Sequence, residues 1–127
     1  MAVSRRYSKT SVIKRNQKQS LLFREIAQLI QRASVDDPSL NEFSISRVEL
    51  SDDRGCCYVY FFSELGKINF KDFTAKLRLY KPSMRAALAK NVNARRVPEI
   101  IFRYDEQFAK TKEVEDLIES VKTEVEE

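Results

Sequence analysis

The chain has 127 residues, the size of one ordinary domain, and 43% of them are hydrophobic, so it can bury a core. It contains no histidine, which removes the commonest general base and the commonest metal ligand, so we expect neither an enzyme, nor a metal site, nor a cofactor. The longest apolar run has the length of a strand, so we expect a protein of the cytoplasm that does not interact with a membrane.

The net charge of +4 conceals four blocks of alternating sign. They carry +7 over residues 1–32, −5 over 33–66, +8 over 67–103 and −6 over 104–127. Acidic residues are absent from 1–24 and from 73–98, a pattern that favours a polyanionic partner. Solvated helix faces, a membrane surface and, for residues 1–24, an organellar transit peptide are the alternatives that composition leaves open.

The first predicted element is an amphipathic helix over roughly residues 18–34, which Asp37-Pro38 ends. Its apolar residues have helical spacing and are Leu22, Ile26, Leu29, Ile30 and Ala33. Residues 43–50 then alternate in polarity, but the phase of the alternation changes near Arg47. This pattern predicts a strand with a bulge at that point.

A turn over residues 51–55 leads to a second predicted strand over 56–62, which is rich in β-branched and aromatic residues. Cys56 and Cys57 are neighbours, so alternation points one thiol into the core and the other toward the surface. Two adjacent cysteines suit neither a disulfide between distant segments nor the usual spacing of a metal site, and they fit a reducing compartment.

The second helix is predicted to begin near residues 67–69 and to bury Ile68, Phe73 and Leu77. Pro82 cannot continue that helix but suits the first turn of a new one, so Tyr80-Lys81-Pro82 predicts a kink. The new helix should run from Pro82 to about Asn91. The residues expected to face inward on it are Met84, Ala87 and Leu88.

Residues 99–104 predict a third strand, which Val97-Pro98 leads into. A last helix is expected after a cap at Thr111. Its apolar stripe consists of Val114, Leu117, Ile118 and Val121. This acidic helix could dock on the sheet or shield the basic face from RNA.

The predicted fold class is therefore α+β, with a three-stranded sheet packed on helices in the order helix, strand, strand, helix, kink, helix, strand. We divide the chain into a basic N-terminal arm over residues 1–17, one domain over 18–118 and an acidic C-terminal tail over 119–127.

This order of elements resembles that of type II KH domains, and the residues within it resemble the ribosome-binding factor A family over roughly 18–118. The segments that carry the likeness are Asp37-Pro38, Ser46-Arg-Val-Glu-Leu-Ser-Asp-Asp53, Tyr58-Val-Tyr60, Met84-Arg85 with Leu88, and Arg95-Arg-Val-Pro-Glu-Ile-Ile-Phe-Arg-Tyr-Asp105. Many KH domains clamp single-stranded RNA with a Gly-x-x-G loop. The family has an Ala-x-Gly kink in its place, and this chain has Tyr80-Lys81-Pro82.

The resemblance implies an assembly factor that binds the small (30S) ribosomal subunit and assists late maturation and processing of 16S rRNA in the bacterial cytoplasm. It also implies a KH-like RNA-binding domain. We expect a monomer without a small-molecule substrate. A generic KH-like RNA-binding or protein-interaction module without an assembly role is the alternative.

The predicted RNA site is centred on the helix that starts at Pro82, because a helix N-terminus attracts phosphate and Lys81 and Arg85 flank it. The remaining candidates for phosphate contact are Arg15, Lys18, Lys76, Arg78, Lys90, Arg95 and Arg96. Each could instead be a solvated side chain. Tyr80 could stack on a base, although a core position is the commoner role for an aromatic residue at a helix junction.

Overall fold

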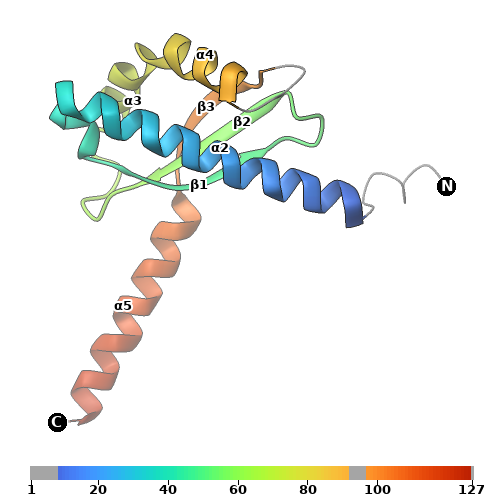
Figure 1. The fold of residues 1–127 in the computed structure, drawn as a ribbon. Coiled ribbons are helices and arrows are strands. Elements are labelled where there is room, and N and C mark those ends of the chain that lie inside the picture. Colours follow the sequence, from blue (N-terminus) through green and yellow to red (C-terminus); the bar gives the residue numbers. More distant parts are fainter. Residues whose placement is uncertain (1–8, 92–96, 127) are drawn as a thin grey trace.

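A computed structural model describes residues 9–91 and 97–126 (Figure 1). Its elements, in chain order, are α2 (Lys9–Asp36), the 3-10 helix η1 (Pro38–Asn41), β1 (Ser44–Leu50), β2 (Cys56–Phe62), α3 (Phe70–Arg78), α4 (Lys81–Asn91), β3 (Glu99–Tyr104) and α5 (Glu106–Glu126). The predicted order of helices and strands is confirmed.

The three strands form one sheet in the order β1-β2-β3, in which β2 is central. β2 pairs antiparallel with β1 and parallel with β3, and the return from β2 to β3 passes through α3 and α4. The register of β1 shifts between Ile45 and Arg47, which confirms the predicted bulge. α2, α3 and α4 lie on one face of this sheet (Figure 1), so the predicted α+β architecture is confirmed.

The core lies between that face of the sheet and the three helices. Its fully buried side chains come from every layer and include Leu22, Ile26, Val59, Phe61, Phe73, Leu77, Met84, Leu88 and Ile100. In an aromatic cluster, the centre of the Phe73 ring lies 4.8 Å from that of Phe43 and 5.1 Å from that of Phe61. Cys57 is completely buried and Cys56 is half-buried, as the alternation along β2 predicts.

α2 begins at Lys9, well before the predicted start at residue 18. The apolar spacing that marks residues 18–34 does not extend to the basic residues that precede them, so periodicity gave no signal there. Those residues contain neither glycine nor proline, so nothing in their sequence ends the helix. The first part of α2 therefore continues the helix that packs on the core, although it has no apolar face of its own.

The prediction that Ile68 is buried is wrong, since 72% of its surface is exposed. Gly66 and Asn69 both have positive φ values, of 83° and 68°, and they turn the chain just before α3. The helix then begins at Phe70, and the buried residues Phe73 and Leu77 follow as predicted.

α5 begins directly after Asp105 rather than after Thr111. The Asp105 carboxylate accepts a hydrogen bond of 2.9 Å from the backbone N–H of Phe108, which is the geometry of an N-cap. The Thr111 hydroxyl instead donates to the carbonyl of Gln107 within the helix. The predicted cap is therefore wrong, because the strand and the helix are joined by a single residue.

The acidic helix α5 leads away from the domain (Figure 1). Its apolar stripe, which consists of Val114, Leu117, Ile118 and Val121, is 52–61% exposed. Docking of this stripe on the sheet, one of the two expectations for the helix, is therefore wrong. Contact with the sheet is made at the first turn, where the ring of Phe108 packs 4.7 Å from that of Phe62.

Candidate nucleic-acid interface

α3 and α4 meet where the sequence predicts a kink. α3 ends at Arg78 and α4 starts at Lys81, so only Leu79 and Tyr80 separate the two helices. Pro82 is the second residue of α4, a position at which the missing N–H breaks no helical hydrogen bond. The glycine-free junction is thus ordered by a proline that favours the start of a new helix.

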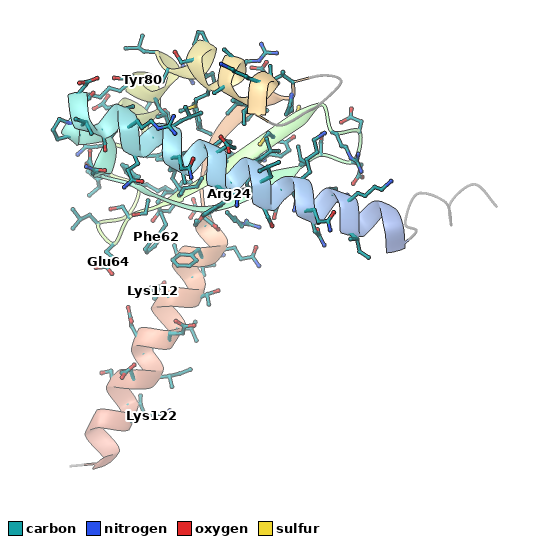
Figure 2. All side chains as sticks on the ribbon, viewed as in Figure 1. Arg24, Phe62, Glu64, Tyr80, Lys112 and Lys122 are labelled. Carbon is teal, nitrogen blue, oxygen red and sulfur yellow. The ribbon has the colours of Figure 1, made fainter. Side chains whose placement is uncertain are left out.

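Tyr80 occupies the junction between the two helices (Figure 2). Its side chain is half-buried and packs against the hydrophobic core. Its backbone carbonyl accepts a hydrogen bond of 2.9 Å from the N–H of Met84, which links the junction to the first turn of α4. Tyr80 therefore has the core position that the sequence favoured over base stacking.

The two helices carry a basic surface. We name it the kink surface and define it as Lys76, Arg78, Lys81, Arg85 and Lys90. Lys81 is half-buried and the other four side chains are exposed. No acidic residue occurs between residues 73 and 91. Solvent-exposed cations are suited to contact a phosphate backbone. Lys76 also donates a hydrogen bond of 3.0 Å to the Ser39 hydroxyl of η1.

Lys81 and Arg85 converge on one carboxylate. The Lys81 Nζ and the Arg85 Nη1 each lie 3.9 Å from a carboxylate oxygen of Glu99, the first residue of β3. Both distances are at the upper limit for an ion pair, and exposed pairs contribute only about 0–1 kcal/mol. The Lys81 Nζ also lies 5.2 Å from the centre of the Phe102 ring. Glu99 therefore neutralises the two cations only weakly, and a stronger anion could replace it.

Two further candidates lie on α2, and two lie outside the described residues. Arg15 forms a 2.9 Å ion pair with Asp52 in the turn between β1 and β2, so its charge already has a partner. Lys18 is half-buried on the same helix. Arg95 and Arg96 belong to the segment 92–96, which the structure does not describe, and they stay predictions.

Asp105 is a buried charged residue whose contacts were not predicted from the sequence. Its side chain is 1% exposed and accepts hydrogen bonds from Ser46 Oγ at 2.7 Å and from Arg47 Nε at 2.9 Å. Burial raises the pKa of this carboxyl, but the hydrogen bonds from Ser46, Phe108 and Arg47 outweigh that effect and hold the pKa below its ordinary value. An aspartate between a strand and a helical run was the available signal for this cap.

Among residues 9–91 and 97–126, no cluster of histidine, cysteine and acidic side chains could hold a metal ion. A helix long and apolar enough to cross a membrane is likewise not found in the described part of the chain.

Comparison with known proteins extends the likeness over most of the chain. The family model "Ribosome-binding factor A" matches residues 14–118. A ribosome-binding factor A from Prochlorococcus marinus is 35% identical over 104 residues, which cover 81% of this chain and 80% of the relative. One from Desulfitobacterium hafniense is 35% identical over 106 residues, which cover 83% of each chain.

The fold agrees with that of a solved relative. The crystal structure of ribosome-binding factor A from Thermus thermophilus superposes with a TM-score of 0.58 at 27% sequence identity and covers 69% of this chain and 92% of that one. The shared fold is KH-like, and this chain contains no Gly-x-x-G sequence, since its two glycines are Gly55 and Gly66. The chain belongs to the ribosome-binding factor A family.

Proposed function

We propose that this protein is an assembly factor that binds the small (30S) ribosomal subunit in the cytoplasm and assists the late maturation and processing of 16S rRNA. Membership of the ribosome-binding factor A family, over residues 14–118, is the observation that carries this proposal. The protein would act as a monomer, without a cofactor or a small-molecule substrate. Its chemistry would be binding alone.

The kink surface is the part of the molecule that we propose for rRNA. Arg85, Lys76 and Arg78 project from two helices that meet at a fixed junction, so a phosphate backbone could contact several of them at once. Arg95 and Arg96 would extend this surface at the approach to β3. Arg15 and Lys18 would add contacts from α2.

A phosphate is expected close to the start of α4, where the partial positive charge of the helix adds to the charges of Lys81 and Arg85. Their shared partner, Glu99, would be displaced from both cations when the phosphate binds. KH domains that use a Gly-x-x-G loop bring their backbone against RNA. This chain would use side-chain cations at the start of α4 instead.

Depletion of the protein in its own host tests the proposed role. Precursor 16S rRNA and free subunits should accumulate, and expression of the wild-type chain should restore their levels. The Lys81→Glu/Arg85→Glu variant should not restore them. Normal processing of 16S rRNA in depleted cells would contradict an assembly role.

A generic KH-like RNA-binding or protein-interaction module is the alternative. It predicts normal rRNA processing after depletion, together with either RNA binding that does not prefer small subunits or a protein partner whose capture resists nuclease.

A further inference from the structure

The sheet has a second face that none of α2, α3 and α4 covers (Figure 1). Along β2, Cys57, Val59 and Phe61 are buried in the core, so Tyr58 and Tyr60 between them point to the opposite face. This outer face therefore carries Tyr58 and Tyr60 on the central strand of the sheet, and Phe62 follows them in the same phase.

Both tyrosines are paired with arginines from the flanking strands. The Arg47 guanidinium carbon lies 4.1 Å from the centre of the Tyr60 ring, and that of Arg103 lies 4.4 Å from the centre of the Tyr58 ring. In the register of the sheet, Arg47 on β1 and Arg103 on β3 are both direct neighbours of Tyr60. On the outer face, a guanidinium group thus lies over each of the two tyrosine rings.

The two arginines differ in their charge partners. Arg47 is ion-paired with Asp105 and Glu49, so its position is fixed and its charge is balanced. Arg103 is exposed, and its guanidinium group lies over the Tyr58 ring. Within the described ranges of the chain, it has no acidic partner. Arg103 therefore offers an uncompensated positive charge beside an aromatic ring.

A small pocket continues this patch at the base of α5. It has a volume of about 220 Å³ and is lined by Arg47, Asp105, Gln107, Phe108 and Thr111. Phe108 is 44% exposed and packs against Phe62, the next outward-facing aromatic residue of β2 (Figure 2). The lining provides a ring face together with the amide of Gln107 and the hydroxyl of Thr111, groups that can stack on a nucleobase and hydrogen-bond with its edge.

We propose that the outer face of the sheet binds single-stranded RNA through its bases. Unpaired bases would stack on the two arginine–tyrosine pairs, Arg47 with Tyr60 and Arg103 with Tyr58. The charge of Arg103 would attract the backbone, and a neighbouring base would enter the pocket beside Phe108. Alternate residues of a strand lie about 6.6 Å apart, a separation that successive nucleotides of an extended strand can span. A duplex could not use this face, because its bases are already stacked on one another.

This site is separable from the kink surface. The kink surface belongs to α3 and α4, which lie on the covered face of the sheet (Figure 1). Tyr58 and Tyr60 alternate with the buried residues of β2 and so point to the outer face, where Phe108 packs against Phe62. The inference therefore goes beyond the proposed function and does not rest on it. RNA binding by one surface can be lost while binding by the other is kept.

Fluorescence anisotropy with labelled single-stranded octamers of uridine and of adenosine tests the proposal. We expect saturable binding by the wild-type protein, and little competition from a duplex of matched length and composition. The Tyr58→Leu/Tyr60→Leu variant should weaken octamer binding by at least about tenfold, since stacking contributes strongly for each base. The matched Tyr58→Phe/Tyr60→Phe variant keeps both rings and should bind within about threefold of the wild type.

Photocrosslinking locates the site even where the leucine variant does not fold. An octamer that contains 5-iodouracil should crosslink to Tyr58, Tyr60 or Phe108, and Arg103→Glu should reduce the yield. The proposal would be overturned if the wild-type protein did not bind the octamers, or if the duplex competed as well as an unlabelled octamer. Equal octamer affinities of the leucine and phenylalanine double variants would also overturn it. Crosslinks confined to Tyr80 would also overturn it, without affecting the test of the proposed function.

Discussion

Asp105 is the residue at which three elements are joined. It follows β3 directly, caps α5 through the N–H of Phe108 and accepts hydrogen bonds from Ser46 and Arg47 of β1. A buried carboxylate is costly unless it is fully hydrogen-bonded, and this one has a neutral, a charged and a backbone donor. The bulge in β1 allows Ser46 and Arg47, which are consecutive, to reach the same carboxylate.

The Asp105→Asn variant should lower the free energy of unfolding by about 1–3 kcal/mol at pH 7, because the amide keeps the shape but loses the charged hydrogen bond with Arg47. The pKa of Asp105 in the folded protein lies below its ordinary value of 3.8, so the carboxylate stabilises the fold above that pH. The stabilisation is lost as the pH falls through the lowered pKa.

Urea unfolding measured from pH 7 down to about pH 3 checks this prediction. The difference between wild type and Asp105→Asn should shrink below about pH 4, because the carboxyl of the unfolded wild-type chain, with an ordinary pKa of 3.8, takes up a proton before that of the folded chain does. A difference that stays constant over the whole range would show that Arg47 and Asp105 are not coupled through charge.

The two cysteines should differ in reactivity. Burial, and to a lesser degree the neighbouring Cys56, raises the pKa of the Cys57 thiol to about 12, so this group is protonated at neutral pH and is sheltered from reagents. Cys56 is half-buried on the outer face of β2. An aromatic disulfide reagent should titrate one thiol in the native protein and two in denaturant. Two fast thiols in the native state would contradict the register of β2.

At the scale of elements, the sequence pattern predicts which segments form the packed helices and strands, but it does not predict where every helix begins. Residues 56–62 are rich in β-branched and aromatic residues and 99–104 follow the entry Val97-Pro98, and both strands have the predicted bounds. The start of α2 and the cap of α5 were missed, because neither is marked by apolar spacing. Ile68 was misplaced because two positive φ angles, invisible to periodicity, turn the chain before α3.

The candidate site divides in the same way. The residues of the kink surface and the junction at Pro82 follow from an acid-free tract and a proline, both of which are visible in the sequence. The contact of Lys81 and Arg85 with Glu99 was not predictable, since it depends on how α4 packs beside the start of β3. The pairing of Tyr58 with Arg103 depends in the same way on the parallel register between β2 and β3.

Truncation of an apolar residue should affect stability differently on α4 and on α5. Leu88 on α4 is buried, so Leu88→Ala should cost about 2–5 kcal/mol of unfolding free energy. Leu117 on α5 is 61% exposed, so Leu117→Ala should change it by no more than about 0.5 kcal/mol. Chemical denaturation of both variants gives the comparison. A large loss for Leu117→Ala would mean that the stripe of α5 is covered in solution.

On the scale of the whole molecule, charge is segregated in space as well as in sequence. The cations of α3 and α4 lie over the core domain, whereas the acidic helix α5 leads away from them (Figure 1). The remaining expectation for α5, that it shields the basic face, finds no support in this arrangement. A small net charge is therefore compatible with a local field that attracts RNA.

The most direct test of the central proposal is the affinity of purified 30S subunits for the protein, measured by co-sedimentation at several salt concentrations. For the wild type, log affinity should fall linearly with log salt, with a slope that reflects the number of phosphates contacted. The Lys81→Glu/Arg85→Glu variant should bind at least about tenfold more weakly and with a shallower slope. The matched variant Lys110→Glu/Lys122→Glu makes the same change of charge on α5 and should bind within about threefold of the wild type. A role for the kink surface in binding the subunit would be contradicted if both double variants lost the same amount of affinity for the 30S subunit. It would also be contradicted if neither variant lost affinity while the thermal midpoints of unfolding stayed unchanged.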